Sequence, residues 1–174
     1  MSQLKSIIKR LVPQYEFYRI FKCELPAKQV QLANQFDFCL IEEQALKKQA
    51  LYVSTQAYQN ENSLAFGITH NNNLIAIQWY WYGHQVNKLD WWSTPENSAM
   101  SMHIQVTPEY QGQGVSTQLK SLALAELKKQ GFQYAFSRVW HNHWASIAMN
   151  RKLKAKQVGW LVRLFNKNFH AKYC

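Results

Sequence analysis

Residues 106–116, which read VTPEYQGQGVS, contain the residue types best suited to binding a phosphate group. Two glycines, Gly112 and Gly114, and the small residue Ser116 fall between a predicted strand and the predicted start of a helix. Glycine permits positive φ and lets the backbone approach a ligand closely. The first N–H groups of a helix lack partners within it and lie at the positive end of its dipole, where a pyrophosphate binds well. The same pattern also fits a tight connection that binds nothing.

Four residues of metal-ligand type form a second candidate group. His141 and His143 are separated by one residue, and His170 and Cys174 lie close together at the end of the sequence. Imidazole and thiolate are the ligands that zinc prefers. The first pair belongs to a motif described below, and the second pair lies at a chain end. We therefore interpret all four as surface residues and predict no metal site.

The candidate phosphate turn belongs to a run of alternating strands and helices. We predict a strand, a helix, a strand, a helix and a final strand, in that order, over residues 100–106, 114–130, 132–140, 143–153 and 156–165. In the first of these helices apolar residues recur at helical spacing, so one face should be buried. Its inward side chains are predicted to be Val115, Leu119, Leu122, Ala123 and Leu127.

The preceding residues predict a helix, several strands and a hairpin. Apolar residues at helical spacing, followed by Pro13, indicate a short basic amphipathic helix over residues 1–12. Strands are predicted over 15–24 and 36–41, helix-forming residues over 42–59, and a hairpin with strands over 64–68 and 74–82. The last of these strands has bulky residues on both faces, which is typical of a central strand. These elements predict a single α/β domain with a mixed sheet.

The turn resembles the acyl-CoA signature of the GNAT superfamily of N-acyltransferases, V-x-P-x-x-(Arg/Gln)-x-x-G-x-(G/A). Val106, Pro108, Gln111 and Gly114 match this signature, and Ser116 stands where Gly or Ala is usual. The resemblance covers roughly residues 35–166 and is most specific over 100–160.

A second motif of that family, N-x-x-(S/A)-x-x-x-(Y/L)-x-K-x-G-F, is matched less completely. Ser146 and Lys152 match it, whereas His143 replaces the Asn and Asn150 replaces the Tyr or Leu. The resemblance predicts a GNAT-like domain over residues 35–174. Residues 1–34 are predicted to be an N-terminal extension, a helix and an extra strand packed on that domain.

The resemblance implies acetyl-CoA or another acyl-CoA as co-substrate, and no metal. The backbone of the turn would hold the CoA pyrophosphate, and the preceding strand would pair with the pantetheine arm. The residues implied at the pyrophosphate are Gln111, Gly112, Gln113, Gly114, Val115 and Ser116. The residues implied at the pantetheine arm are Ile104, Gln105, Val106, His143, Ser146 and Asn150.

The GNAT reaction is a direct attack of a neutral amine on the thioester, and it needs a general base and an oxyanion donor. By resemblance the donor is the backbone N–H of Val106. We predict His103 as the catalytic base, because imidazole titrates near neutral pH and this strand carries the thioester. Strict alternation would turn His103 away from the side of Met100 and Met102, against a helix. A β-bulge before Val106 would reverse that direction.

The departing thiolate also needs a proton, and many relatives supply it from a Tyr at the position of Asn150. An amide side chain cannot act as this acid. Tyr80 and Tyr82, on the long predicted strand, are candidate substitutes. A domain that binds acyl-CoA without catalysis is the alternative hypothesis.

Composition narrows the remaining classes of function. Hydrophobic residues make up 47% and aromatic residues 14% of the chain, which indicates a folded protein. The 20 Lys and Arg against 10 Asp and Glu give a net charge of +10, which favours anionic partners. No Lys- and Arg-rich recognition helix is evident, so nucleic acid is the less favoured partner.

Cysteine usage and hydropathy bear on location. Cys23, Cys39 and Cys174 are odd in number and form no CxxC pair, which suits a reducing compartment. No apolar run is long enough to span a membrane or to form the core of a signal peptide. The sequence therefore predicts a cytoplasmic protein with no transmembrane segment.

Taken together, the residues and the resemblance predict an acyl-CoA-dependent N-acyltransferase, most simply an N-acetyltransferase. The acceptor is predicted to be an amine of a small or sugar-like molecule. A catalytically silent acyl-CoA-binding domain and a basic nucleic-acid-binding module are the alternatives. Residues 79–92 are rich in Trp and could stack on a sugar ring, pack in the core or form the contacts of a homodimer.

Overall fold

The computed structural model describes residues 15–87, 92–164 and 167–173 of the 174-residue chain. Within these residues, eight strands form one sheet in the order β2-β3-β4-β5-β6-β1-β7-β8. The strands are β1 Tyr15–Glu24, β2 Asp37–Leu40, β3 Ser63–His70, β4 Asn73–Tyr82, β5 Ser98–Val106, β6 Tyr134–Trp140, β7 Lys156–Leu164 and β8 Lys167–Lys172. The helices are α2 Gln44–Lys47, α3 Ala50–Thr55, α4 His84–Asn87, α5 Val115–Lys129 and α6 Trp144–Lys152, with 3₁₀ turns η1 Gln56–Tyr58 and η2 Pro108–Tyr110. The predicted helix over residues 1–12 lies outside the described residues.

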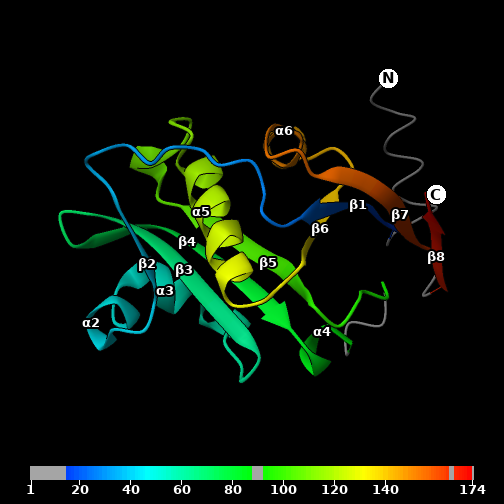
Figure 1. Cartoon of the computed structure of the whole chain (residues 1–174), viewed down its shortest axis with the longest axis horizontal. Coiled ribbons are helices and arrows are strands. Elements are labelled where there is room, and N and C mark those ends of the chain that lie inside the picture. The colour runs from blue at the N-terminus through cyan, green and yellow to red at the C-terminus, as the bar shows by residue number, and fades with distance from the viewer. Residues whose placement is uncertain (1–14, 88–91, 165–166, 174) are drawn as a thin grey trace.

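The sheet is mixed, because β5 and β6 run parallel and the other described neighbours run antiparallel. Helix α5 packs across one face of β3, β4 and β5, and α2 and α3 pack on the other face (Figure 1). Strand β4 therefore has buried side chains on both faces. The predicted α/β fold with a mixed sheet and a covered central strand is confirmed.

Strand β1 is a full member of the sheet. It lies between β6 and β7 and pairs with both, so residues 15–24 of the N-terminal segment are hydrogen-bonded into the interior of the sheet. The strand predicted over 156–165 is present as β7, but the prediction that it is the final strand is wrong, because β8 follows it. β8 is an edge strand with mostly exposed, polar side chains, so it lacks the buried alternation that marks a strand in a sequence.

The helix-forming residues 42–59 form three short elements, α2, α3 and η1. The break occurs at Gln49, whose backbone is extended (φ −74°, ψ 146°). The Gln49 side chain donates to the carbonyl of Asn72 (2.9 Å) and accepts from the N–H of Leu74 (2.6 Å). These two bonds tie the break to the β3–β4 turn, a tertiary contact that helix propensity cannot predict.

The inward face of α5 can be tested by truncating its leucines. Leu119 is fully buried in the core beneath the helix, whereas Leu122 is only half-buried, contrary to its predicted inward position. Leu119→Ala should lower the free energy of unfolding by about 2–5 kcal/mol, because it removes buried methyl groups and leaves a cavity. Leu122→Ala is the matched control and should cost clearly less in urea unfolding. Equal losses would mean that the buried face of the helix has been misassigned.

Candidate functional site

The site begins where β5 and β6 separate. The two strands pair from Ser98 and Tyr134 as far as Ser101 and Ser137, and the pairing ends there. β5 continues to Val106 along β4, while β6 continues to Trp140 along β1. Because each strand keeps its other neighbour, the sheet stays intact on both sides of the opening.

A cavity of about 300 Å³ occupies this opening. Both strands contribute to its walls, and α5 and α6 contribute residues from one face of the sheet. The lining residues are Ser101, Met102, His103, Ile104, Lys120, Ser137, Arg138, Val139, Trp140, His143, Ser146, Met149 and Asn150. The structure thus brings together five of the predicted site residues, which are His103, Ile104, His143, Ser146 and Asn150.

The direction of His103 is set by a β-bulge. In the β4–β5 register Trp79 lies opposite His103 and Tyr80 lies opposite Ser101, so Met102 is the extra residue. Opposed residues of an antiparallel pair share a face, and Trp79 packs against α3. The His103 ring stacks on Tyr58, with 4.8 Å between ring centroids and 9° between planes. His103 therefore lies on the α3 side of the sheet and still borders the cavity.

The end of β5 presents a free backbone edge to the opening. The N–H of Thr107 donates to Ile75 on β4 (2.9 Å). Since N–H groups alternate in direction along a strand, those of Ile104 and Val106 point away from β4, where β6 has already diverged. The Val106 carbonyl accepts from Gln111 Nε2 (3.0 Å). Gln105, between Ile104 and Val106, is exposed. An extended amide-containing chain could pair with this edge.

Past Val106, the chain makes the Gly-containing turn and enters α5. Gly112 and Gly114 have φ of 76° and 79°, a region that favours glycine. A Cβ built on Gly112 meets no described atom within 4 Å, and one on Gly114 meets only Gln118 Nε2 at 4.0 Å. Among the described residues, none accepts a hydrogen bond from the N–H groups of residues 112–116. These N–H groups form an open, electropositive helix N-terminus.

The remaining turn residues support this geometry in different ways. Gln113 Nε2 donates to the carbonyl of Glu109 (2.8 Å), which closes the turn, and the Val115 side chain is buried beneath α5. Ser116 follows Val115 in the first turn of the helix. The role of Gln111, Gly112, Gln113, Gly114, Val115 and Ser116 at a pyrophosphate stays a prediction.

The N-terminus of α6 closes the cavity on one side. His143 is its N-cap residue, and its Nδ1 accepts from the backbone N–H of Ser146 (3.2 Å). Asn150, which is 1% exposed, donates from Nδ2 to the carbonyl of Ser146 (2.8 Å). The cap explains why a histidine can replace the Asn of the second motif, since both side chains can accept this hydrogen bond.

Lys120 is the site residue that sequence reasoning missed. Its side chain comes from α5, is 3% exposed and borders the cavity. Nζ donates to Ser137 Oγ and to Asn150 Oδ1, each at 2.8 Å. Burial lowers the pKa of Lys120 to about 8, and no described carboxylate pairs with it. Lys120 precedes Leu124 and Leu127 by four and seven residues, the helical spacing that could have placed it on the buried face.

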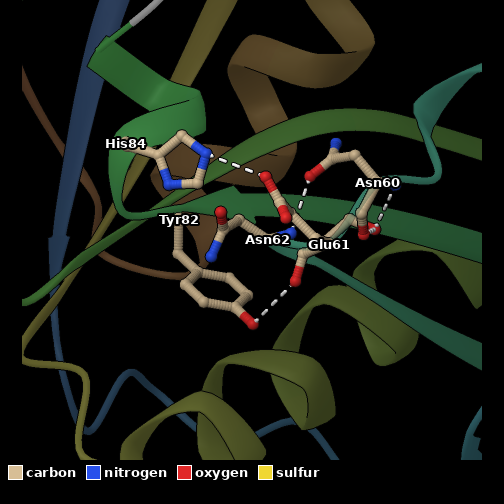
Figure 2. A network of polar contacts seen from close by, with 6 residues as sticks. Asn60, Glu61, Asn62, Tyr82 and His84 are labelled. Carbon is tan, nitrogen blue, oxygen red and sulfur yellow. Dashed lines mark hydrogen bonds and ion pairs between the residues drawn. The ribbon is translucent and has the colours of Figure 1, made fainter.

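Neither tyrosine suggested as an acid borders the cavity. Tyr80 is fully buried under α5, its hydroxyl accepts from Gln78 Nε2 (2.9 Å), and burial raises its pKa. Tyr82 is the last residue of β4, where its hydroxyl donates to the Glu61 carbonyl (3.5 Å) near the His84–Glu61 contact (Figure 2). Trp79 is likewise buried in the core, so it cannot stack on an exposed sugar.

The first two histidines of the suggested zinc group have other contacts. His141 stacks on Phe17 at 4.9 Å between centroids, and His143 caps α6. Within the described part of the chain, no group of three or more His, Cys, Asp or Glu could hold a metal ion. Cys174, the fourth member of the suggested group, lies outside the described residues.

Comparison with known proteins places this geometry in a known fold. No protein-family model matches the sequence, and no curated protein matches it. Among solved structures, a GNAT-family protein from Novosphingobium aromaticivorans is similar over 87% of this chain and 64% of its own, with 14% identity and a TM-score of 0.62. The chain thus spans less than two thirds of that protein.

Two further structures are similar over shorter stretches. The ribosomal-protein-alanine N-acetyltransferase of Brucella melitensis is 12% identical over 69% of this chain and 91% of its own (TM-score 0.52). An aminoglycoside acetyltransferase from an uncultured soil sample is 14% identical over 71% of this chain and 90% of its own (TM-score 0.53). The chain has the fold of the GNAT N-acetyltransferases, as the sequence resemblance predicted.

The buried position of Lys120 predicts a pH-dependent stability. Its pKa is about 8 in the fold against 10.5 when exposed, so between these values the unfolded chain binds more protons than the folded one. The Lys120 contribution to the free energy of unfolding should therefore rise with pH from about 8 to 10.5, by up to about 1.4 kcal/mol per pH unit. Lys120→Met should lack this rise, which urea unfolding of both proteins measures. Cys23 is the titratable group that faces Lys120, and burial is the main cause of its raised pKa. Its contribution to the pH dependence of stability should therefore be largely the same in wild-type protein and in Lys120→Met.

Parallel pH curves for the two proteins would show that Lys120 titrates like an exposed lysine. Lys120→Met should itself fold, since an apolar isostere of a buried cation is often neutral or stabilising.

Proposed function

We propose that this protein is an acyl-CoA-dependent N-acyltransferase that transfers an acetyl or related acyl group to an amine. The observation that carries the proposal is the opening between β5 and β6, with its cavity beside a Gly-containing turn at the N-terminus of α5. The two features provide complementary surfaces for the two ends of acyl-CoA. One is an electropositive helix end for the pyrophosphate, and the other is a free strand edge leading to a cavity for the thioester.

In the proposed complex the N–H groups of residues 112–116 hold the pyrophosphate. The pantetheine arm pairs with the outward N–H groups of Ile104 and Val106 and reaches the cavity bordered by His143, Ser146 and Asn150. The net charge of +10 favours an anionic co-substrate of this kind. The thioester carbonyl then lies in the cavity. Val106, the oxyanion donor that the resemblance implies, does not border this cavity, so we assign its N–H to the pantetheine arm instead.

For the chemical step we propose that His103 takes the proton from the attacking amine. Its imidazole borders the cavity from the α3 side, stacked on Tyr58 and half-buried. The acceptor amine would therefore approach from that side of the sheet. We propose a small or sugar-like acceptor, because the cavity volume of about 300 Å³ suits a compact group.

We also propose a cytoplasmic location. Cys23 and Cys39 are free thiols, which suits a reducing compartment. No helix in the described residues is long and apolar enough to cross a membrane. A catalytically silent acyl-CoA-binding domain is the alternative: it would bind acetyl-CoA without releasing CoA in the presence of any amine.

Acetyl-CoA should stabilise the protein against heat, because a ligand that binds only the folded state adds about 2.7 kcal/mol at a hundredfold excess over Kd. Gly114→Asp should abolish the increase in Tm, since it places a carboxylate at the pyrophosphate. Gly131→Asp is the matched control, because Gly131 also has positive φ (95°) and open space around it but follows the C-terminal end of α5. Both variants carry similar backbone strain, so only the first should lose binding.

The absence of any Tm increase with acetyl-CoA, CoA or longer acyl-CoAs would refute the proposed function. Equal loss of binding in both glycine variants would instead attribute the effect to backbone strain. Salt-sensitive binding of RNA or DNA without a CoA effect would support the nucleic-acid alternative.

His103→Ala should lower kcat by about 10²–10⁴-fold with little change in acetyl-CoA affinity, the range typical of general base catalysis. The assay is release of CoA across a panel of amines. His141→Ala is the control, because His141 also stacks on an aromatic ring but does not border the cavity. Near-normal kcat in His103→Ala would assign His103 a purely structural role.

A further inference from the structure

Departure of the CoA thiolate requires a proton donor in the cavity. Asn150 has no proton to give, and Tyr80 and Tyr82 lie outside the cavity. Among the residues that border it, Lys120 combines an exchangeable proton with a position on the α5 side, where the pantetheine arm would enter. Resting on the proposed function, we propose that Lys120 is the acid that protonates the sulfur of CoA as the thioester breaks.

The position of Lys120 Nζ supports this role. One of its hydrogen bonds goes to Ser137, the last residue of β6 that pairs with β5. The other goes to Asn150 on α6, at the position where the family motif has its acid. An ammonium has three N–H groups, so two hold the side chain in place and the third remains for a ligand. Nζ is therefore fixed at the point where the strands diverge.

Ser137 and Asn150 act as positioning residues for Lys120. Asn150 is itself held by its bond to the Ser146 carbonyl (2.8 Å), so its Oδ1 is directed at Nζ. Replacing a Tyr by Asn would remove an acid from a site of this kind. Here the Asn150 amide oxygen accepts from Lys120 Nζ. The position that lacks a Tyr acid therefore holds Lys120, the proposed acid, in place.

Lys120 also has suitable acidity. Burial brings its pKa to about 8, and a free thiol has a pKa near 8.5. Proton transfer between groups of similar pKa is nearly balanced in free energy, whereas an exposed lysine would be a weaker acid than a thiol. The facing groups are Ser137 on β6, Asn150 on α6 and the buried thiol of Cys23 on β1, whose pKa burial raises. No described carboxylate pairs with Lys120.

The proposed step conserves atoms and charge. The acceptor nitrogen forms a bond to the carbonyl carbon, and His103 takes the proton that this nitrogen loses. The C–S bond then breaks, its electron pair goes to sulfur, and the Lys120 ammonium gives sulfur a proton. The products are the N-acyl compound and CoA thiol. Afterwards neutral Lys120 regains a proton from solvent and the imidazolium of His103 returns one.

The test compares wild-type protein with Lys120→Met and Lys120→Arg, measuring CoA release and acetyl-CoA-dependent Tm. Both variants should bind acetyl-CoA and lose about 10²–10⁴-fold in kcat. Lys120→Arg is the critical variant, because guanidinium keeps the positive charge but its pKa exceeds about 12, so it cannot donate a proton. Full activity in Lys120→Arg would overturn proton donation in favour of a purely electrostatic role. Full activity in Lys120→Met would overturn any role for this side chain.

The pH profile provides a second test. For wild-type protein kcat should fall as pH rises through the pKa of Lys120, and this alkaline decline should be absent from the residual activity of Lys120→Met. Asn150→Asp should move the decline to higher pH, because a carboxylate beside Lys120 favours its charged form. A decline that stays in place in both variants would overturn the proposal.

Failure of this inference differs from failure of the proposed function. An active wild-type enzyme with active Lys120 variants would leave the acyltransferase proposal standing and remove Lys120 as the acid. Wild-type protein that neither binds nor turns over acetyl-CoA would remove both.

Discussion

The separation of β5 from β6 after Ser101 and Ser137 is the constraint on which the rest of the site depends. Hydrogen-bonded strands lie about 4.8 Å apart, which leaves no room for a ligand between them. Once the pairing ends, the backbone groups of two strands need other partners, because unpaired buried N–H and C=O groups are costly. A strand edge left unpaired in this way can bind an extended, amide-containing chain as an added strand.

The opening also bears on the burial of Lys120, in a chain of which only 17% of the residues are charged. A buried lysine without a carboxylate partner lowers the stability of a fold. In place of a carboxylate, Lys120 has two neutral hydrogen-bond acceptors, Ser137 Oγ and Asn150 Oδ1. An apolar side chain in the same position would remove that cost. The position of Lys120 beside Ser137, where β5 and β6 diverge, is therefore better explained by a chemical role than by a contribution to stability.

What the sequence could predict follows from how local each feature is. The turn of Gly112 and Gly114 depends on adjacent residues, so its glycines and the following helix were predictable. The bulge at Met102 depends on the register between β4 and β5, which no local pattern encodes, so strict alternation gave the wrong direction for His103. Lys120 was overlooked because a lysine in a helix is usually exposed. Its partners, Ser137 and Asn150, come from elements that only the fold brings together.

The bulge and the buried lysine together connect the two faces of the sheet. An intact sheet separates the groups above it from those below, yet His103 on the α3 side and Lys120 on the α5 side border one cavity. Acyl transfer requires proton removal at one atom of the tetrahedral intermediate and proton delivery at another, by groups that must not neutralise each other. In the proposed mechanism, the β4–β5 register holds His103 on one face, and α5 and α6 hold Lys120 on the other. The proposed base and acid are then kept apart, while each borders the cavity that would hold the tetrahedral intermediate. The divergence of two strands is what makes that arrangement possible in a single small domain.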